Sequence, residues 1–343
     1  MAGGNPMTRY VRQTCLPGMG EAGQVALKAA HVLVVGAGGL GAPALQYLVG
    51  AGIGRLTLVD GDTVSLGNLH RQTLFREDDI GRPKVEAAQD TLRRLNTDCR
   101  IVPLACPLDP ANAPDLVAQA SLVLDCADSF AVSYILSDTC LAAGVPLVSA
   151  SVLGVSGYVG GFCGTAPSLR AVFPDLPDRA ATCATAGVMG PVVGMIGAAQ
   201  AQMALACLTG QTPSPLGQVL TVDMQAFRSS SFRFDTAPEP AEGLHFIATD
   251  QLKHTDVVVD LRGTEEAPNP VSPRAQRRSV SDVIAGRLQP PATGQRAVFA
   301  CRSGLRAWQA ARHLQRHWDG DIALVATGDA PGASALPEQT DPG

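Results

Sequence analysis

The chain lacks any paired arrangement of its cysteines. Nine cysteines in 343 residues fall singly, and no two of them form a C-x-x-C pair. This absence argues against a disulfide framework and against a four-thiolate zinc site. Unpaired thiols are typical of a reducing compartment, so we expect a cytoplasmic protein with no zinc site.

The chain also has little excess charge and no long uninterrupted hydrophobic run. Its net charge of -5 argues against a cationic nucleic-acid binder, and its 46% hydrophobic content argues against disorder. The most apolar stretch, 188–208, is broken by three glycines and two glutamines, and no basic segment precedes an apolar one. We therefore predict neither a signal peptide nor a membrane-spanning helix.

Patterns of buried strands alternate with helical patterns up to residue 234. This alternation predicts an α/β fold with a doubly wound, Rossmann-like, mostly parallel sheet. The expected strands are 31–35, 55–60, 121–125 and 146–150, followed by a terminal pair at 218–223 and 230–234. The expected helices are 21–30, 42–50, 83–95, 130–143 and 190–208.

A short acidic stretch rich in proline, 235–243, has the composition of a linker. We therefore predict a first domain over 1–236, a linker over 237–247, a small second α/β domain over 248–331 and a flexible tail over 332–343. In the second domain, 256–260 and 296–300 are expected strands, and 307–318 is an expected helix.

A glycine cluster, Gly36-Ala-Gly-Gly-Leu-Gly41, stands between the first strand and the first crossover helix. In this position the backbone amides and the helix dipole receive a phosphate, and the missing β-carbons let a nucleotide approach closely. Asp60 follows the second strand, 24 positions after Gly36, where a carboxylate accepts hydrogen bonds from a ribose. Taken alone, the glycine cluster and Asp60 fit a nicotinamide-dependent dehydrogenase as well as they fit an enzyme that uses another nucleotide.

The residues after Asp60 favour a triphosphate. Cations and amide donors neutralise the charge that develops when pyrophosphate leaves, whereas hydride transfer needs no such cluster. The residues of this kind are Asn68, Arg71, Gln72 and Lys84. Asp62 is a further candidate for nucleotide binding, or it caps the turn that follows. At the end of the 121–125 strand, Asp128 is placed for magnesium, and Asp125 is either a ligand or a structural hydrogen-bonding group. We predict nucleotidyl transfer.

From Arg9 to Phe234 the chain resembles the ThiF/MoeB family of adenylyltransferases, bacterial relatives of ubiquitin-activating enzymes. The resemblance implies a homodimer that uses ATP and magnesium to adenylate the C-terminal glycine of a ubiquitin-like sulfur carrier ending in Gly-Gly. The segment 9–13, Arg-Tyr-Val-Arg-Gln, resembles the family's N-terminal signature, which implies that Arg12 reaches the partner subunit's nucleotide. The resemblance also assigns phosphate binding to Gly36, Gly38, Gly39 and Gly41, ribose to Asp60, the phosphate surroundings to Asn68, Arg71, Gln72 and Lys84, and magnesium to Asp128.

Two departures from the family pattern stand out. Family members often carry two C-x-x-C pairs for a structural zinc, but 167–171 and 230–242 contain no cysteine here, so we expect the loop to be held by packing alone. The family usually has Asp-Asn with an arginine four residues on, whereas this chain has Asp128 followed by Ser129, and Val132 and Ser133 in place of the arginine. This second change leaves open a scaffold that binds the carrier without activating it.

Two cysteines are candidates for sulfur chemistry. Cys183 lies in a segment resembling that of the family's reactive cysteine, which in some members forms a thioester or persulfide; the alternative is an ordinary buried thiol. Cys301 begins the loop Cys-Arg-Ser-Gly-Leu-Arg306, which resembles the active loop of rhodaneses. The loop's amides and arginines are expected to lower the pKa of the Cys301 thiol.

Together these features predict ATP-dependent activation of a carrier carboxylate, coupled to sulfur transfer from a rhodanese-like persulfide. The sulfur donor is thiosulfate or the persulfide of a cysteine desulfurase. A carrier-binding scaffold and an NAD-dependent oxidoreductase remain as alternatives. The sequence does not identify the pathway or the carrier protein.

Overall fold

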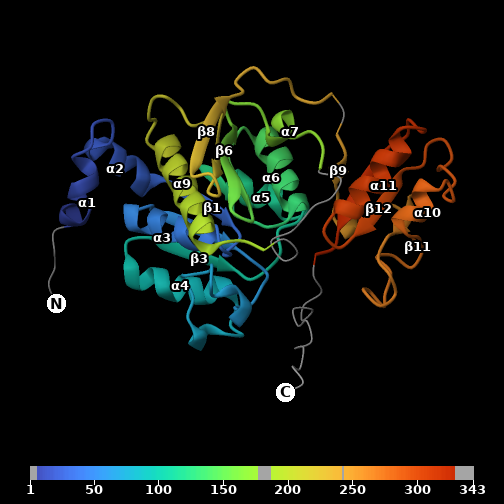
Figure 1. Cartoon of the computed structure of the whole chain (residues 1–343), viewed down its shortest axis with the longest axis horizontal. Helices are drawn as coiled ribbons and strands as arrows, with labels where there is room; N and C mark the ends of the chain where they lie inside the picture. Colours follow the sequence, from blue (N-terminus) through green and yellow to red (C-terminus); the bar gives the residue numbers. More distant parts are fainter. Residues whose placement is uncertain (1–5, 177–186, 242, 329–343) are drawn as a thin grey trace. The chain divides into compact units, whose positions relative to one another are not determined.

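A computed structural model describes residues 6–176, 187–241 and 243–328, and the chain divides into two compact units, 1–243 and 244–343. The first unit contains an eight-stranded sheet (Figure 1). Across the sheet the strands are β3 (Arg100–Leu104), β2 (Arg55–Val59), β1 (His31–Val35), β4 (Leu122–Asp125), β5 (Pro146–Leu153), β6 (Ser156–Cys163), β7 (Gln218–Asp223) and β8 (Arg228–Arg233). The first five are parallel and the last three antiparallel, which confirms the predicted doubly wound sheet.

Helices follow the parallel strands as right-handed crossovers require. On one face, α3 (Gly41–Ala51) packs against both α4 (Lys84–Leu95) and α9 (Gly190–Leu208); elsewhere α5 (Ala113–Ala118) packs against α6 (Phe130–Ala143). Elsewhere in the described part of this unit, the helices are α1 (Pro6–Thr14), α2 (Gly20–Ala29), α7 (Leu169–Val172), η1 (Leu66–Asn68) and η2 (Glu77–Asp79). The strand order reverses between β1 and β4, so a crevice is expected above their carboxyl ends.

Two strands of this sheet were not predicted. The edge strand β3 contains Pro103, which the edge of a sheet tolerates. Strand β6 contains three glycines because neighbouring elements approach its backbone closely: a β-carbon on Gly157 would lie 2.6 Å from Ile196 Cδ1 of α9, and one on Gly161 would lie 2.5 Å from the Pro215 carbonyl oxygen. The glycines that obscured this strand are therefore a packing requirement.

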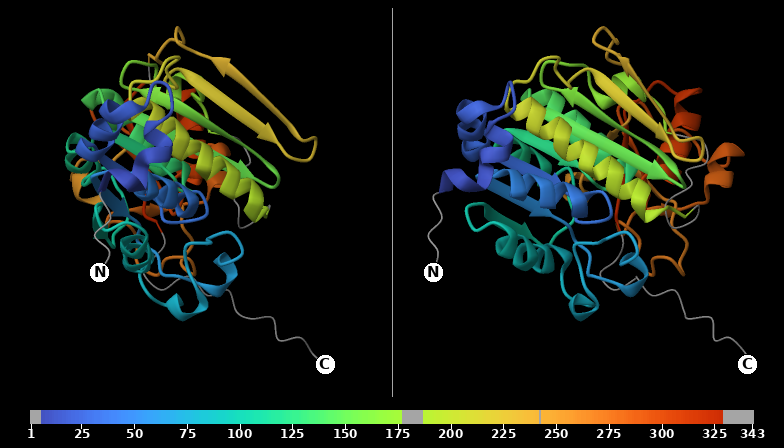
Figure 2. Two further views of the ribbon diagram at one scale, coloured as in Figure 1. Left: turned by 90° about the vertical axis from the view of Figure 1, so that its left-hand side faces the viewer. Right: turned by 60° about the vertical axis from the view of Figure 1, so that its left-hand side comes forward.

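The helix α9 is long and apolar enough to cross a bilayer by length and composition alone. Core helices pass the same test, and 44% of its most apolar window is buried. Figure 2 shows α9 lying along the sheet, where it contacts α3, β5 and β6. Its packing is that of a core helix.

The second unit has a five-stranded parallel sheet of its own. Across it the strands are β11 (Gln276–Arg277), β10 (Val257–Asp260), β12 (Ala297–Cys301), β13 (Ile322–Ala326) and β9 (His245–Phe246). Between residues 244 and 328, the helices are η3 (Thr249–Gln251), α10 (Val280–Ile284) and α11 (Leu305–Gln315). The expected strands at 256–260 and 296–300 correspond to β10 and β12, whereas β13 was not predicted.

Polar bonds hold the loop after β6, where the family's zinc would lie. The Glu239 carboxylate accepts hydrogen bonds from the Ser168 amide at 2.7 Å and from the Ser168 hydroxyl at 2.5 Å. Beside it, the buried Arg170 guanidinium forms a two-point ion pair with Asp138. The expectation that packing alone holds this loop was wrong, because Ser168 and Glu239 join the two segments that lack the cysteines. Glu239 also falls within the stretch expected to be a free linker.

We predict that Glu239→Ala lowers the free energy of unfolding by about 1–3 kcal/mol, because it leaves the buried Ser168 donors without an acceptor. Calorimetric unfolding would measure the change, with the exposed Glu265→Ala as the control. A chelator should leave the wild-type midpoint unchanged. A midpoint that falls with chelator, or an unaltered Glu239→Ala protein, would contradict this account of the loop.

Candidate functional site

The glycine cluster forms a tight loop at the carboxyl ends of β1 and β4. Gly36 has φ +99°, and its amide donates to the Val59 carbonyl at 2.8 Å. A β-carbon on Gly36 would lie 2.6 Å from the Cys126 carbonyl oxygen, and one on Gly41 would lie 2.1 Å from the Gly36 oxygen. Only glycine fits at either position. The loop therefore presents bare backbone at the start of α3, as an anion-binding turn requires.

Asp60 joins the end of β2 to this loop. Its two carboxylate oxygens accept from the Ala37 amide at 2.7 Å and from the Asp62 amide at 2.8 Å. Burial raises the pKa of Asp60, while the charge of Lys84 and the two amides oppose that rise. Each oxygen keeps a second lone pair, so the carboxylate can still accept from a ligand hydroxyl.

The two predicted phosphate-site cations have different surroundings. Lys84 is the first residue of α4 and is 4% exposed, and its Nζ lies 2.7 Å from the exposed Asp62 carboxylate. Arg71 donates to Asn68 Oδ1 at 2.7 Å, and its side chain lies beside the glycine loop, 3.4 Å from where a β-carbon on Gly39 would be. Both cations are fixed by a neighbouring oxygen.

Gln72 has an unsatisfied buried amide oxygen. The residue is 3% exposed, and its Oε1 has no hydrogen-bond partner among the described residues. Its amide nitrogen lies 3.7 Å from where a β-carbon on Gly38 would be. A buried polar atom without a partner is destabilising, so this amide next to the glycine loop is suited to a ligand or a water molecule.

The two aspartates after β4 differ in burial. Asp125 is fully buried and accepts from the Ser149 hydroxyl at 2.8 Å and the Ala127 amide at 3.2 Å; burial raises its pKa to about 6. Asp128 is exposed, just before α6. Among the described residues no three histidines, cysteines or acidic residues cluster as a metal site. One exposed carboxylate fits a magnesium ion held mainly by nucleotide phosphates and water.

Helix α9 closes one side of the glycine loop, which the sequence analysis missed. A β-carbon on Gly39 would lie 2.7 Å from Val193 Cγ1, and one on Gly197 would lie 2.4 Å from the Leu40 carbonyl oxygen. At the start of α9, one on Gly190 would lie 2.5 Å from the His70 carbonyl oxygen. The glycines spaced along this apolar helix could have indicated the contact, since residues without a side chain let the backbone of a helix approach a neighbouring segment.

Arg12 lies away from its own chain's glycine loop. It is exposed on α1, and Gln13 beside it donates to the Ala51 carbonyl at 2.8 Å, at the end of α3. The glycine loop is at the start of α3, and eleven helical residues span about 16 Å. Among the described residues, Arg12 has no hydrogen bond or ion pair, and the structure does not bring it to the other predicted groups. Cys183 lies outside the described residues.

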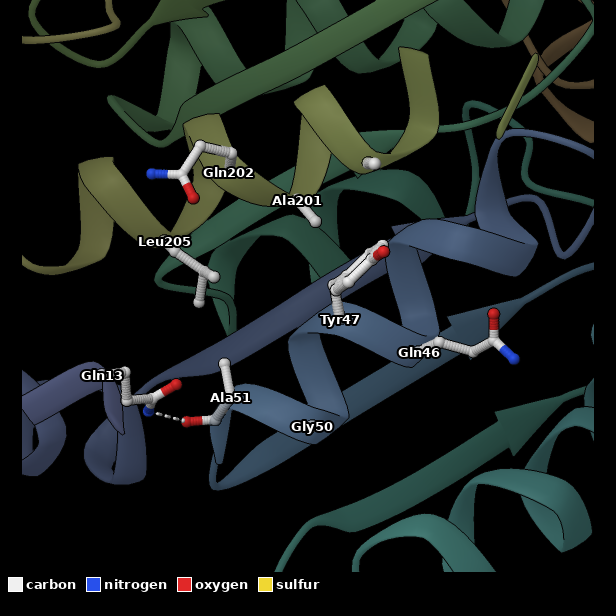
Figure 3. A pocket seen from close by; sticks show the side chains of 9 residues that line it. Gln13, Gln46, Tyr47, Gly50, Ala51, Ala201, Gln202 and Leu205 are labelled. Carbon is white, nitrogen blue, oxygen red and sulfur yellow. Dashed lines mark hydrogen bonds between the residues drawn. The ribbon is translucent and has the colours of Figure 1, made fainter. Parts of the chain in front are cut away.

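A hollow of about 370 Å³ lies between α3, α9 and the end of α1 (Figure 3). Gln13, Tyr47, Ala51, Gln202 and Leu205 are among the residues that line it. Tyr47 of α3 is 59% exposed, and Met195 of α9 is 40% exposed. This outer face of the first unit is therefore partly apolar.

In the second unit, β12 ends at Cys301, and α11 begins four residues later. The Cys301 Sγ accepts from the Gly304 amide at 3.1 Å and the Ala307 amide at 3.4 Å. Burial raises the pKa of the thiol, although these amides and the Arg306 charge act to lower it. The expected lowered pKa was wrong in its net direction, because the sulfur is fully buried.

Carboxylates pair with two arginines near Cys301. Arg306 donates to Glu266 and to the Leu261 carbonyl, the latter at 3.0 Å. Arg262 forms a two-point pair with the buried Asp260, at 2.9 and 2.8 Å. The positive charge that the sequence suggested for this loop is therefore partly neutralised within the fold.

Comparison with known proteins shows which family and which relatives the first unit is similar to. The ThiF family model matches residues 10–243. The chain is 45% identical over 219 residues to the molybdopterin-synthase adenylyltransferase of Escherichia coli, covering 63% of this chain and 88% of that protein. It is 45% identical over 210 residues to the "adenylyltransferase and sulfurtransferase UBA4" of Yarrowia lipolytica, covering 59% of this chain and 52% of that protein. The chain thus spans about half the length of UBA4.

Solved structures support the fold. Escherichia coli MccB, in a crystal structure with ATP, superimposes with a TM-score of 0.60 at 21% identity, covering 70% of this chain and 75% of that chain. PaaA superimposes with a TM-score of 0.57 at 24% identity, covering 68% and 74%. The match of the family model over the whole glycine-loop unit, together with this fold, establishes that the chain belongs to the ThiF family.

Proposed function

We propose that the first unit is an ATP-dependent adenylyltransferase that activates the C-terminal Gly-Gly carboxylate of a ubiquitin-like sulfur carrier. The observation that carries this proposal is the convergence of the glycine loop, Asp60, Arg71 and Lys84 at the carboxyl ends of β1 and β2. The names of the relatives favour adenylation over the dehydrogenase alternative. Two fixed cations beside an anion-binding loop would stabilise the charge on a leaving pyrophosphate, whereas hydride transfer would have no use for them.

In the proposed reaction, a carrier carboxylate oxygen attacks the α-phosphorus of ATP. A new P–O bond forms, and the bond to the β-phosphate bridge breaks with pyrophosphate as the leaving group. The loop amides and the start of α3 hold phosphate oxygens, and Arg71 and Lys84 stabilise the charge on the leaving group. Asp60 holds the ribose, and Asn68 and Gln72 orient the phosphate surroundings. Asp128 would hold magnesium, which supplies further charge neutralisation.

The unit is further proposed to act as a homodimer. The apolar face around Tyr47 and Met195, with the hollow beside it, offers a surface that a second copy would cover. Arg12 stands at the end of α3 remote from its own glycine loop, so it can serve a nucleotide only in a partner. A guanidinium supplied from the partner would stabilise phosphate charge in the same way as Arg71.

The second unit is proposed to carry sulfur on Cys301, and Cys183 is a candidate relay. The two amides that reach the Cys301 sulfur would stabilise a persulfide anion. The outer sulfur of that persulfide attacks the acyl carbon of the carrier adenylate and AMP leaves. A second thiol, for which Cys183 is a candidate, then attacks the Cys301 sulfur. A disulfide forms between the two thiols, and the thiocarboxylate leaves with the electron pair of the broken S–S bond.

Lys84→Met should reduce ATP–pyrophosphate exchange, assayed with a candidate carrier, by about 100-fold or more, because a buried cation is lost. The exposed Lys28→Met serves as the control and should exchange normally. Exchange at the wild-type rate in Lys84→Met would refute the role assigned to this lysine.

Mixing Arg12→Ala and Lys84→Met chains should restore activity if Arg12 acts in the partner. After subunit exchange, half of the dimers are mixed and each has one intact site, so about a quarter of wild-type exchange is expected. Each variant alone is the control. Absence of recovery, with mixed dimers shown to form, would argue against action across the dimer.

Cys301→Ala should retain exchange but abolish thiocarboxylate formation, which mass spectrometry of the carrier would detect. The exposed Cys15→Ala is the matched control and should form thiocarboxylate normally. If Cys301→Ala lost both activities, the proposed division of labour between the two units would be incorrect.

A further inference from the structure

Part of the positive charge around Cys301 is paired inside the fold. Arg262, Arg302 and Arg306 lie in the cysteine loop or near it, and the carboxylates of Asp260 and Glu266 pair with Arg262 and Arg306. Each of these pairs reduces the positive charge that the region presents to an anionic donor.

Glu266 differs from Asp260 in its exposure. Asp260 is fully buried and holds Arg262 at two points, so it is part of the framework of this end of the sheet. Glu266 lies on the loop after β10 and is 27% exposed, and its partner Arg306 is 36% exposed. Arg306 and the Gly263 amide keep the pKa of Glu266 low, so it is ionised at neutral pH. Glu266 therefore pairs its negative charge with a partly exposed arginine of the cysteine loop.

We propose that Glu266 is a specificity-determining residue that selects against dianionic sulfur donors, of which thiosulfate is the simplest, and in favour of persulfides. By pairing with Arg306 it occupies a cation of the cysteine loop that would otherwise attract a dianion, and it adds a negative charge beside that loop. This inference rests on the proposed role of Cys301 as a sulfur acceptor.

The two donor reactions differ in the charge they bring to the loop. With a persulfide, the Cys301 thiolate attacks the outer sulfur of R–S–SH, a new S–S bond forms, and R–S⁻ leaves with the electron pair of the broken bond. With thiosulfate, the thiolate attacks the outer sulfur of a dianion, the same kind of bond forms, and sulfite leaves with two negative charges. A persulfide group brings at most one negative charge next to Cys301, whereas thiosulfate brings two, so Glu266 affects the thiosulfate reaction more strongly.

The test compares donors on the full-length chain. The persulfide of 2-mercaptoethanol, which carries no carboxylate, and thiosulfate serve as donors. Cyanide accepts the sulfur and thiocyanate is measured, while the mass of the chain reports loading of Cys301. In Glu266→Gln, the ratio of kcat/KM for thiosulfate to kcat/KM for the persulfide should rise about tenfold or more, through a lower KM for thiosulfate. Glu265→Gln is the matched control, because it removes the same charge one residue away, and its ratio should stay at the wild-type value.

The possible outcomes distinguish failure of the role of Glu266 from failure of the proposed sulfur-carrying function of Cys301. If the wild-type chain loads Cys301 from the persulfide but Glu266→Gln and Glu265→Gln have equal donor ratios, the role of Glu266 is overturned. If neither donor loads Cys301 in the wild-type chain, the proposed sulfur-carrying function itself fails. A measurement without a variant gives a second test: millimolar sulfate, an unreactive dianion, should leave wild-type persulfide turnover unchanged, and competitive inhibition by sulfate would overturn the inference.

Discussion

The close approach of two backbone segments at the carboxyl ends of β1 and β4 is the constraint on which the nucleotide site depends. Gly36 lies against the Cys126 carbonyl, and Gly41 lies on the carbonyl of Gly36 itself. Neither contact leaves room for a side chain, so the loop is bare backbone by necessity. Asp60 then fixes the loop from β2, and α9 covers it through Gly197. The groups proposed to act on phosphate are arranged around this fixed turn.

Much of the first unit could be predicted from its sequence because parallel strands buried on both faces are continuous apolar runs. The runs at 31–35 and 55–60 and the glycine cluster between them need no tertiary information to be found. Strand β6 could not be found in this way. Its glycines are required by close contacts with Ile196 and Pro215, which are remote in sequence. Strand β13 is different: its run of Ile, Ala, Leu, Val and Ala was visible, and the sequence analysis overlooked it.

The candidate sites show which chemical properties depend on burial. Types and positions of charged residues predicted which groups would gather near the glycine loop. They did not predict that Lys84 would be buried against an exposed Asp62, or that Asp125 would be enclosed and bonded to Ser149. At Cys301 the sequence showed arginines and a glycine but not the two carboxylates that pair with them. The pKa of a thiol is a balance between desolvation and nearby charge, and only the folded chain determines that balance.

The Ser168–Glu239 contact affects how stable the first unit is in the presence of reactive sulfur compounds. Zinc held by four thiolates is vulnerable to oxidants and to sulfane compounds, because each attack on a thiolate removes a ligand and releases the ion. A hydroxyl and a carboxylate present no such target. The Ser168–Glu239 contact would therefore persist under sulfur chemistry that removes thiolate-bound zinc from a protein.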